Sequence, residues 1–323
     1  MKQEPTYFTI MPDANRHNQF TITAAGELAL EAIDYPNQGY VAALFEHSFY
    51  IKIFSKWACI GTSSLPFGPL NLQTNAPNNI NWQASGFQTG DPVKISATHI
   101  HIRNHYMFSY RDAELWRPEP IFNLDKTAIQ AGLNALKNQA QDMAPSDGLA
   151  SLIFANNKLD ARLSAASQAI NEIDNFFRDQ GTHTNSILKP VTSLIGLGPG
   201  LTPSGDDFLG GIMIMLRLLK QNNKIKRLAG AIEMAASATN EISQAHLKAA
   251  AQGLGAEPLH ATISDIILNR SSELQPSLQR LDAIGHCSGW DALAGAVIAL
   301  RAWLAQSHRL SQHRHSADRR LHL

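Results

Sequence analysis

The stretch Leu194-Ile-Gly-Leu-Gly-Pro-Gly-Leu-Thr-Pro-Ser-Gly-Asp-Asp-Phe-Leu-Gly-Gly-Ile-Met-Ile-Met-Leu-Arg217 organises the second half of this chain. Its first ten residues hold three glycines and two prolines. They cannot continue a regular element, because glycine opens positive φ and proline removes a backbone donor. From Phe208 to Leu219 only Arg217 is polar, and the run is shorter than the roughly 20 residues of a membrane span. The sequence predicts a turn with exposed amides that leads into a buried core helix.

Polar residues mark the start of this helix. Ser204 is a candidate N-cap, and Asp206 and Asp207 follow in the first turn, where the helix dipole favours negative charge. Adjacent helical residues point about 100° apart, so at most one of the two acids faces a given ligand. The alternative is that both acids only complement the dipole.

A second stretch repeats the pattern. Ser204–Arg217 aligns without a gap on Ser288–Arg301, and the two share S-G-x-D-x-L-x-G-x-x-I-x-L-R. Such internal similarity predicts two equivalent loop-to-helix units in one helical domain. The matched Gly211 and Gly295 favour a close approach of the two helices. Asp207 and Asp291 would then lie around one pocket, a hypothesis that widely separated carboxylates would contradict.

The comparison of the two repeats also distinguishes Asp206 from Asp207. It keeps an acid at Asp207 and Asp291, whereas Trp290 stands opposite Asp206. We therefore assign the shared functional role to Asp207 and Asp291, and treat Asp206 as a secondary binding candidate.

Length and composition bound the classes of function. With 323 residues the chain suits two domains, and its formal net charge of +0 gives no footprint for nucleic acid or an anionic membrane. Two cysteines, Cys59 and Cys287, are too few for a disulfide framework or a thiolate cluster. The N-terminus has no apolar signal region, so we expect a soluble cytoplasmic protein.

The chain changes its periodicity near Arg117-Pro-Glu-Pro120. Residues 1–117 contain short β-branched or aromatic runs, which predict a β-rich barrel or sandwich-like domain. The predicted strands are 19–23, 39–45, 48–54, 57–61, 90–95 and 98–102. Residues 121–305 predict an all-helical domain with the glycine-rich loop, and 306–323 a disordered tail. The predicted helices besides the two repeats are 125–138, capped by Asp125, then 159–179, 226–252, 258–268 and 274–283. The fold class is α+β.

The glycine-rich loop has the composition of an anion cradle. Clustered glycines expose N–H groups, and a helix N-terminus adds partial positive charge. The loop fits neither a Walker A motif nor G-x-G-x-x-G. The candidate anion-binding residues are Gly198, Gly200, Thr202, Ser204 and Gly205. A purely structural turn is the alternative.

The turn before the second repeat also carries polar groups. Gly285-His-Cys-Ser-Gly289 places an imidazole, a thiol and a hydroxyl ahead of a buried helix. His286 is a candidate acid, base or oxyanion donor, and Ser288 and Gly289 are candidate binding residues. Cys287 is either a thiol activated by the helix N-terminus or an inert part of a capping turn.

Two further groups of polar residues are weaker candidates. Thr239 and Ser243 are four residues apart in the Ala-rich segment and would share a helix face, although back-bonding of hydroxyls to carbonyls is the alternative. His99 and His101 share one face of a predicted strand, but no third ligand is identifiable, so we predict no metal site.

Three motifs together resemble a known family. Leu-Gly-Pro-Gly-Leu-Thr-Pro-Ser-Gly-Asp-Asp-Phe-Leu-Gly at 197–210, Thr-Asn-Glu-Ile-Ser at 239–243 and Gly-His-Cys-Ser-Gly-Trp-Asp at 285–291 are similar to a bacterial domain-of-unknown-function family. This family includes AllH, a subunit of oxamate carbamoyltransferase. The likeness covers roughly residues 40–305. The chain departs from the family pattern at Cys287, where a hydroxyl is usual, and at Asn240, where Thr is commoner.

The resemblance implies phosphorolysis of oxalurate to oxamate and carbamoyl phosphate, together with two other subunits, in anaerobic allantoin and purine catabolism. Phosphate or carbamoyl phosphate would be a substrate, and no cofactor is predicted. The amides of Gly198, Gly200 and Ser204 would hold the anion, and His286 would donate to the carbamoyl oxygen or shuttle a proton. The need for a divalent ion and self-association into a homo-oligomer stay open.

Two other functions stay open as well. In the first alternative, the chain is a non-catalytic scaffold or anion-sensing subunit that docks partner enzymes. In the second, it is a stand-alone hydrolase that uses Cys287. The hydrolase lacks an identifiable base and orienting group.

Overall fold

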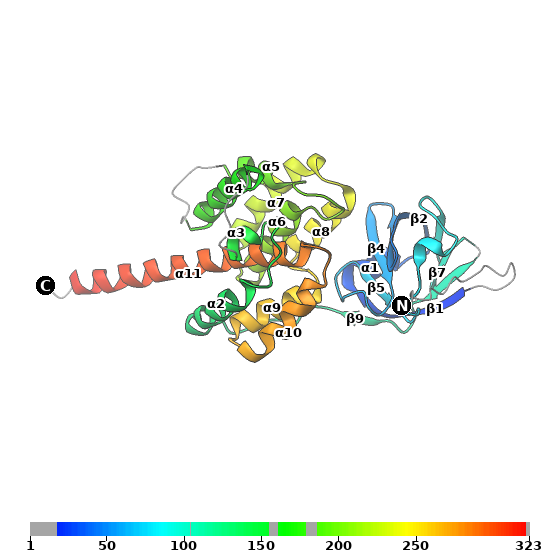
Figure 1. Ribbon diagram of the computed structural model, residues 1–323, viewed down its shortest axis with the longest axis horizontal. Helices are drawn as coiled ribbons and strands as arrows, with labels where there is room; N and C mark the ends of the chain where they lie inside the picture. The colour runs from blue at the N-terminus through cyan, green and yellow to red at the C-terminus, as the bar shows by residue number, and fades with distance from the viewer. Residues whose placement is uncertain (1–17, 104, 155–160, 179–185, 321–323) are drawn as a thin grey trace, which may run out of the picture. The chain divides into compact units, whose positions relative to one another are not determined.

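The computed structural model describes residues 18–103, 105–154, 161–178 and 186–320. The chain separates into two compact units, which divide between Pro118 and Glu119 (Figure 1). The first unit is built of strands and the second of helices, which confirms the predicted α+β class. Among the described helices, none is both long and apolar enough to cross a membrane.

The N-terminal unit is a closed barrel. Its eight strands run in the order β5-β4-β3-β2-β6-β7-β8-β1, and an antiparallel pairing of β1 with β5 closes the sheet. The bounds are β1 (Asn18–Gly26), β2 (Asn37–Leu44), β3 (Ser48–Ile53), β4 (Lys56–Gly61), β5 (Asn71–Thr74), β6 (Pro92–Ile95), β7 (His99–Ile102) and β8 (Tyr106–Ser109). A short β9 (Glu114–Trp116) pairs in parallel with the end of β1. The sequence predicted either a barrel or a sandwich, and the closed sheet shows that the unit is a barrel.

Aromatic side chains fill the barrel. Trp82, from the 3₁₀ turn η1 (Trp82–Ala84), is fully buried and packs edge-on against Phe49. The sequence did not predict β5, β8 and β9, or the helix α1 (Glu27–Ile33). Strands of three or four residues are too short for a two-residue alternation to stand out.

The C-terminal unit is all helical. Its helices are α2 (Lys126–Ala140), α3 (Ser151–Phe154), α4 (Ala161–Arg178), α5 (Leu188–Leu194), α6 (Ser204–Leu218), α7 (Asn222–Ala235), α8 (Glu241–Ala251), α9 (Glu257–Ile267), α10 (Ser271–Asp282) and α11 (Ser288–Arg320), with a 3₁₀ turn η2 (Ala236–Ala238). Asp125 caps α2, as predicted, by accepting from Thr127 N at 2.7 Å. Ser204 is the first residue of α6 and Pro203 holds the cap position, so the predicted N-cap role of Ser204 is wrong.

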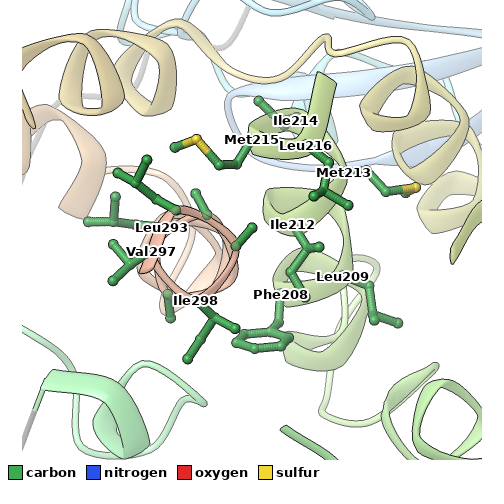
Figure 2. Close-up of a cluster of buried hydrophobic side chains, with 14 of the residues drawn as sticks. Phe208, Leu209, Ile212, Met213, Ile214, Met215, Leu216, Leu293, Val297 and Ile298 are labelled. Carbon is green, nitrogen blue, oxygen red and sulfur yellow. The ribbon is translucent and has the colours of Figure 1, made fainter. Parts of the chain in front are cut away.

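The two repeat helices, α6 and α11, pack directly on each other (Figures 1 and 2). A Cβ built on Gly211 would lie 1.8 Å from the carbonyl oxygen of Ala292. A Cβ on Gly295 would lie 1.9 Å from the carbonyl oxygen of Phe208. Since 208 and 292 are also equivalent positions, each helix presents its glycine to the same place on the other. The predicted close approach through Gly211 and Gly295 is confirmed.

The Ala-rich segment, predicted as one helix over 226–252, is broken in the structure. Helix α7 ends in η2, and Asn240 caps α8 by accepting from Ser243 N at 3.0 Å. The break follows from capping, because the Asn side chain offers the backbone an alternative to helix continuation. Thr239 and Ser243 therefore do not share one face of a continuous helix.

The backbone of 307–320, where low apolar content favoured disorder, continues α11 as helix. This difference has a simple cause, since propagating a helix that is already formed adds one hydrogen bond per residue fixed.

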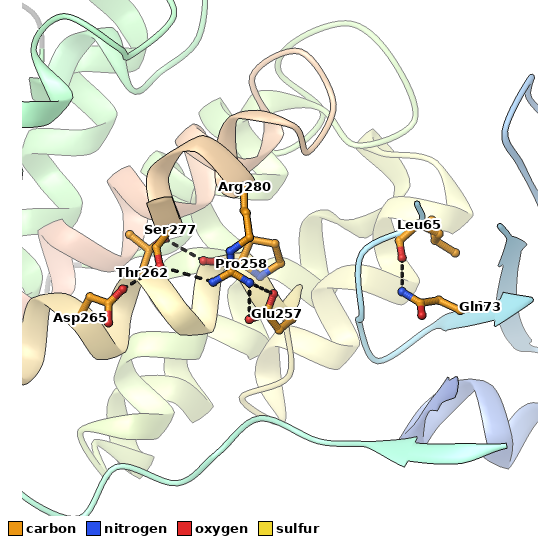
Figure 3. A network of polar contacts seen from close by, with 8 residues as sticks. All are labelled: Leu65, Gln73, Glu257, Pro258, Thr262, Asp265, Ser277 and Arg280. Carbon is orange, nitrogen blue, oxygen red and sulfur yellow. Dashed lines mark hydrogen bonds and ion pairs between the residues drawn. The ribbon is translucent and has the colours of Figure 1, made fainter. Parts of the chain in front are cut away.

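Polar contacts fix α10, which leads into the turn before α11 (Figure 3). Arg280 donates to both carboxylate oxygens of Glu257 at 2.8 and 2.7 Å. Ser277 donates to the buried Asp265 at 2.7 Å. Figure 3 also draws a separate contact of the barrel, in which Gln73 donates to the carbonyl oxygen of Leu65.

Candidate functional site

The glycine-rich loop before α6 has free backbone amides. Gly196, Gly198 and Gly200 all have positive φ, at 73°, 115° and 90°, which explains the glycines. In the described part of the chain, the N–H groups of Gly198, Gly200 and Ser204 donate no hydrogen bond. Gly198 and Gly200 are exposed. The three amides are therefore available to an external acceptor, as the sequence predicted for an anion cradle.

Gly198 keeps the N-terminus of α6 open. A Cβ on Gly198 would lie 2.9 Å from Ser204 N and 3.2 Å from Ser204 Oγ, whereas a Cβ on Gly200 would meet no atom within 4 Å. A side chain at 198 would thus cover the first N–H of the helix. The partial positive charge of a helix N-terminus and its unsatisfied donors favour a phosphate or carboxylate at this position.

Gly205 and Gly289, which the sequence also offered as anion ligands, have a different role. Their N–H groups already donate to Leu197 O at 2.9 Å and to Ile284 O at 3.3 Å. A Cβ would lie 1.8 Å from Leu194 O in the first case and 2.3 Å from Leu281 O in the second. Both glycines let the chain fold tightly against its own backbone, so the structure gives neither amide to a ligand.

Asp206 is a structural acid. It is 2% exposed and accepts from Gly196 N at 2.7 Å and from Ser243 Oγ at 2.6 Å. Thr239 Oγ1 donates to the same carboxylate. The hydroxyls of Thr239 and Ser243 therefore hold Asp206 rather than back-bonding or facing open space. The three contacts tie the glycine-rich loop to the start of α8.

Asp207 and Asp291 form the shared element that the repeat predicted. The Oδ2 atoms of both are buried, and neither has a hydrogen-bond partner in the described part of the chain. The Thr202 and Ser288 hydroxyls meet at 2.9 Å, which joins the residues before the two helices. The two carboxyls are close enough for the charge of Asp291 to act on Asp207. The N-termini of α6 and α11 thus lie together.

Burial sets the protonation of this pair. It raises the pKa of Asp207 well above the ordinary value, although the hydroxyl of Ser288 opposes the shift. Burial likewise raises the pKa of Asp291 to about 6, and here the hydroxyl of Ser204 opposes it. Each serine begins one repeat and acts on the acid of the other, so the arrangement has an approximate two-fold symmetry. The neutral carboxyl form of Asp207 can donate as well as accept a hydrogen bond.

The Gly285–Gly289 turn meets a residue that the sequence did not single out. His286 Nε2 lies 2.7 Å from Asp147 Oδ2, and Cys287 Sγ lies 3.7 Å from Asp147 Oδ1. The hydrogen bond from His286 lowers the pKa of Asp147. Asp147 lies in a polar loop 139 residues before His286 and belongs to no motif, so only tertiary structure brings it to the turn.

Cys287 is not an activated thiol. Burial, together with the charges of Asp291 and Asp147, raises its pKa to about 12. A thiol with this pKa is almost wholly protonated near neutral pH, and the thiolate is the nucleophilic form. This argues against the hydrolase hypothesis, in which Cys287 is the nucleophile.

One of the comparisons with known proteins matches the part of the chain that contains the glycine-rich motif at 197–210. No solved structure matches this chain. The model of a family described as oxamate carbamoyltransferase subunit AllH matches residues 194–300. This segment begins at the glycine-rich loop and includes the first turns of both α6 and α11. Over residues 194–300, therefore, the chain is confirmed to match the family of oxamate carbamoyltransferase subunit AllH.

Proposed function

We propose that this chain is a subunit of a carbamoyl-transferring enzyme of the oxamate carbamoyltransferase type. Its reaction would be the phosphorolysis of oxalurate to oxamate and carbamoyl phosphate, in anaerobic allantoin and purine catabolism. The family match over residues 194–300 supports the subunit role and implies partner subunits. The reaction and the pathway are our inference from that family.

One observation carries the proposal. The free amides of Gly198, Gly200 and Ser204 lie at the N-terminus of α6, inside the matched segment and beside the acid of the same first turn, Asp207. Phosphate and the carboxylate of oxamate both need N–H donors, and helix N-termini supply them. A carbamoyl carbonyl that gains negative charge needs donors of the same kind.

The chemistry needs one proton transfer. An oxygen of hydrogen phosphate attacks the carbamoyl carbon of oxalurate, and the bond from that carbon to the oxamate nitrogen breaks. The leaving nitrogen takes up one proton, and the attacking phosphate loses one, so the step balances without an oxidant or reductant. We assign the transfer to Asp207, whose neutral form can pass a proton to the leaving nitrogen and recover one from phosphate.

The remaining residues have supporting roles. Thr202 and Ser288 would bind the carbamoyl group through their hydroxyls, with Asp291 fixing the loop at Ala150, whose N–H donates to Asp291 at 2.9 Å. His286 lies on the exposed side of the turn with Asp147. Its donation to the carbamoyl oxygen, or its role as a proton shuttle, stays a prediction.

The test uses the complex reconstituted with its partner subunits. Phosphate-dependent loss of oxalurate and formation of carbamoyl phosphate should require this chain. Asp207→Asn should lower kcat about a hundredfold or more, because it removes the proton transfer. Gly198→Ala should raise the KM for phosphate about tenfold, because it covers the Ser204 amide and removes a charge-assisted hydrogen bond.

Ser193→Ala is the matched control. Its hydroxyl is exposed and donates to Lys189 O within α5, so turnover should be unchanged. Wild-type kinetics for both Asp207→Asn and Gly198→Ala, in a complex that still needs this chain, would favour the scaffold alternative. Full activity without this chain would overturn the proposal.

A further inference from the structure

We propose that Asp147, His286 and Cys287 form a binding site for a divalent transition-metal ion of the zinc class. The three residues come from two loops, one before α3 and one before α11. Their ligand atoms, one from each side chain, all lie within 4.8 Å of one another. The proposal rests on the contacts of these three residues and does not depend on the carbamoyl-transfer function.

Side-chain rotation can bring the three ligand atoms around one ion, because they already lie within 4.8 Å of one another. Zinc lies about 2.0–2.3 Å from N, O and S ligands, so tetrahedral ligand atoms are separated by about 3.3–3.7 Å. Cys287 Sγ and Asp147 Oδ1 are already 3.7 Å apart. His286 Nε2 lies 2.7 Å from the other carboxylate oxygen, Oδ2, so rotation of the Asp147 side chain would present one oxygen to an ion held by all three residues. The side chains of His286 and Asp147 are 80% and 60% exposed, which leaves both free to make that movement.

A second observation points to a cation. Asp291 is fully buried, and its Oδ2 has no hydrogen-bond partner among the described residues. A Cβ built on Gly148 would lie 3.0 Å from this Oδ2 and 3.0 Å from Cys287 Cβ. The unpartnered oxygen of Asp291 therefore lies close to Gly148, the loop residue that follows Asp147. A buried polar atom without a partner is costly; Asp291 is not one of the three ligands, but the charge of an ion held by the neighbouring loop would offset part of that cost.

The local charge agrees. In the part of the chain that the structure describes, no lysine or arginine forms an ion pair with Asp147, Asp207 or Asp291. Among the described residues, the side chain within ion-pair distance of Asp147 is His286. The carboxyl groups of Asp147 and Asp291 thus lie beside Cys287, and among the described residues neither is paired with a lysine or arginine. A divalent ion would supply the missing positive charge.

The donor set selects the kind of ion. Imidazole nitrogen and thiolate sulfur favour zinc and its neighbours over Mg²⁺ and Ca²⁺, which take oxygen ligands. Three protein ligands leave a fourth tetrahedral position open to solvent or substrate. With the ion bound, His286 is a ligand and can no longer shuttle a proton.

The test uses the full chain, stripped with a chelator and titrated with Co²⁺ and then Zn²⁺. We expect one ion per chain, a near-ultraviolet thiolate-to-cobalt charge-transfer band, and displacement of cobalt by zinc. Asp147→Asn and His286→Gln should each weaken binding at least about tenfold, since even residues that merely orient a ligand cost 10–100-fold in metal affinity. Cys287→Ser should abolish the band.

Matched controls exist for the Asp147 and Cys287 variants. Asp142→Asn changes an exposed acid near Asp147, and Cys59→Ala removes the other cysteine, which is buried in the barrel; both should keep the cobalt spectrum. Because Asp147 and His286 are exposed, their variants should fold, and thermal unfolding without metal verifies this. Zinc should raise the melting temperature of the wild type and not of Asp147→Asn. Absence of binding, a spectrum without the thiolate band, or affinity unchanged by Asp147→Asn would overturn the proposal.

Discussion

The two repeats of the helical unit share the same helix start and helix contact, but a different buried residue holds each helix in place. Both begin with Ser-Gly, carry an acid at the fourth position and present a glycine to the other helix. At the third position they differ. Asp206 binds Gly196, Thr239 and Ser243, whereas Trp290 donates to Asp282 at 2.7 Å and packs edge-on against Phe154.

This difference separates the residues that hold the helices in place, at the third position, from the candidate site residues at the fourth. The third position is buried in both repeats, but its partners differ: Asp206 binds the glycine-rich loop and the start of α8, whereas Trp290 contacts α10 and α3. The fourth position, Asp207 or Asp291, carries an unpartnered carboxyl oxygen in both. The duplicated acids are the functional element of the proposal above, whereas the third position holds a different structural anchor in each repeat.

The largest expected effect tests the helix contact that the repeats share. Gly211→Ala and Gly295→Ala each place a Cβ within 2 Å of a backbone oxygen, and each should lower the free energy of unfolding by about 3 kcal/mol or more. Gly230→Ala is the control, since a Cβ there meets nothing within 4 Å and should stabilise α7 by about 0.5–1 kcal/mol. Urea denaturation measures all three. A tolerated Gly211→Ala would disprove the close crossing.

The next effect compares the two anchors. Asp206→Ala leaves three buried or half-buried donors without their acceptor and should cost about 2–4 kcal/mol of unfolding free energy. Trp290→Phe loses one hydrogen bond and leaves a small cavity at a buried position, so about 1–2 kcal/mol is expected. Chemical denaturation of both variants gives the values. Equal costs would mean that the third position plays the same role in the two repeats.

The pH dependence of stability tests the duplicated acids. Burial raises the pKa of Asp291 from its ordinary value of 3.8 to about 6 in the folded chain. The native state therefore binds the proton more tightly, and its stability falls as pH rises from about 4 through about 6. The unfolding free energy of Asp291→Asn minus that of the wild type should therefore increase by about 2 kcal/mol as the pH rises from about 4.5 to 7.5. Denaturation with a chelator present measures the gain, and a difference independent of pH would contradict the raised pKa.

The smallest effect concerns the hydroxyl link between the repeats. Thr202→Val and Ser288→Ala each remove one partner of the 2.9 Å contact. A double-mutant cycle on unfolding free energies should give a coupling of about 0.5–1.5 kcal/mol. A coupling near zero would indicate that each hydroxyl acts separately on Asp207.

The sequence predicted what local pattern encodes. The helical repeat, the Gly211–Gly295 contact and the shared position of Asp207 and Asp291 followed from one alignment of fourteen residues. The break at Asn240 was missed because a capping side chain competes with an Ala-rich helix that propensity favours. Asp147 was missed because its contact with His286 spans 139 residues. Gly205 and Gly289 were wrongly predicted as anion ligands because their N–H groups donate to backbone carbonyls, a pairing that cannot be read from a sequence motif.

The central claim is that the two repeats share one ligand site at their N-termini. The most direct test follows backbone amide NMR signals of the full chain during titration with inorganic phosphate and then carbamoyl phosphate. The account predicts that Gly198, Gly200, Ser204 and Ser288 shift together with one midpoint, and that the shifts are lost in Gly198→Ala. Shifts confined to one repeat, different midpoints for the two, or no shift in either would contradict it.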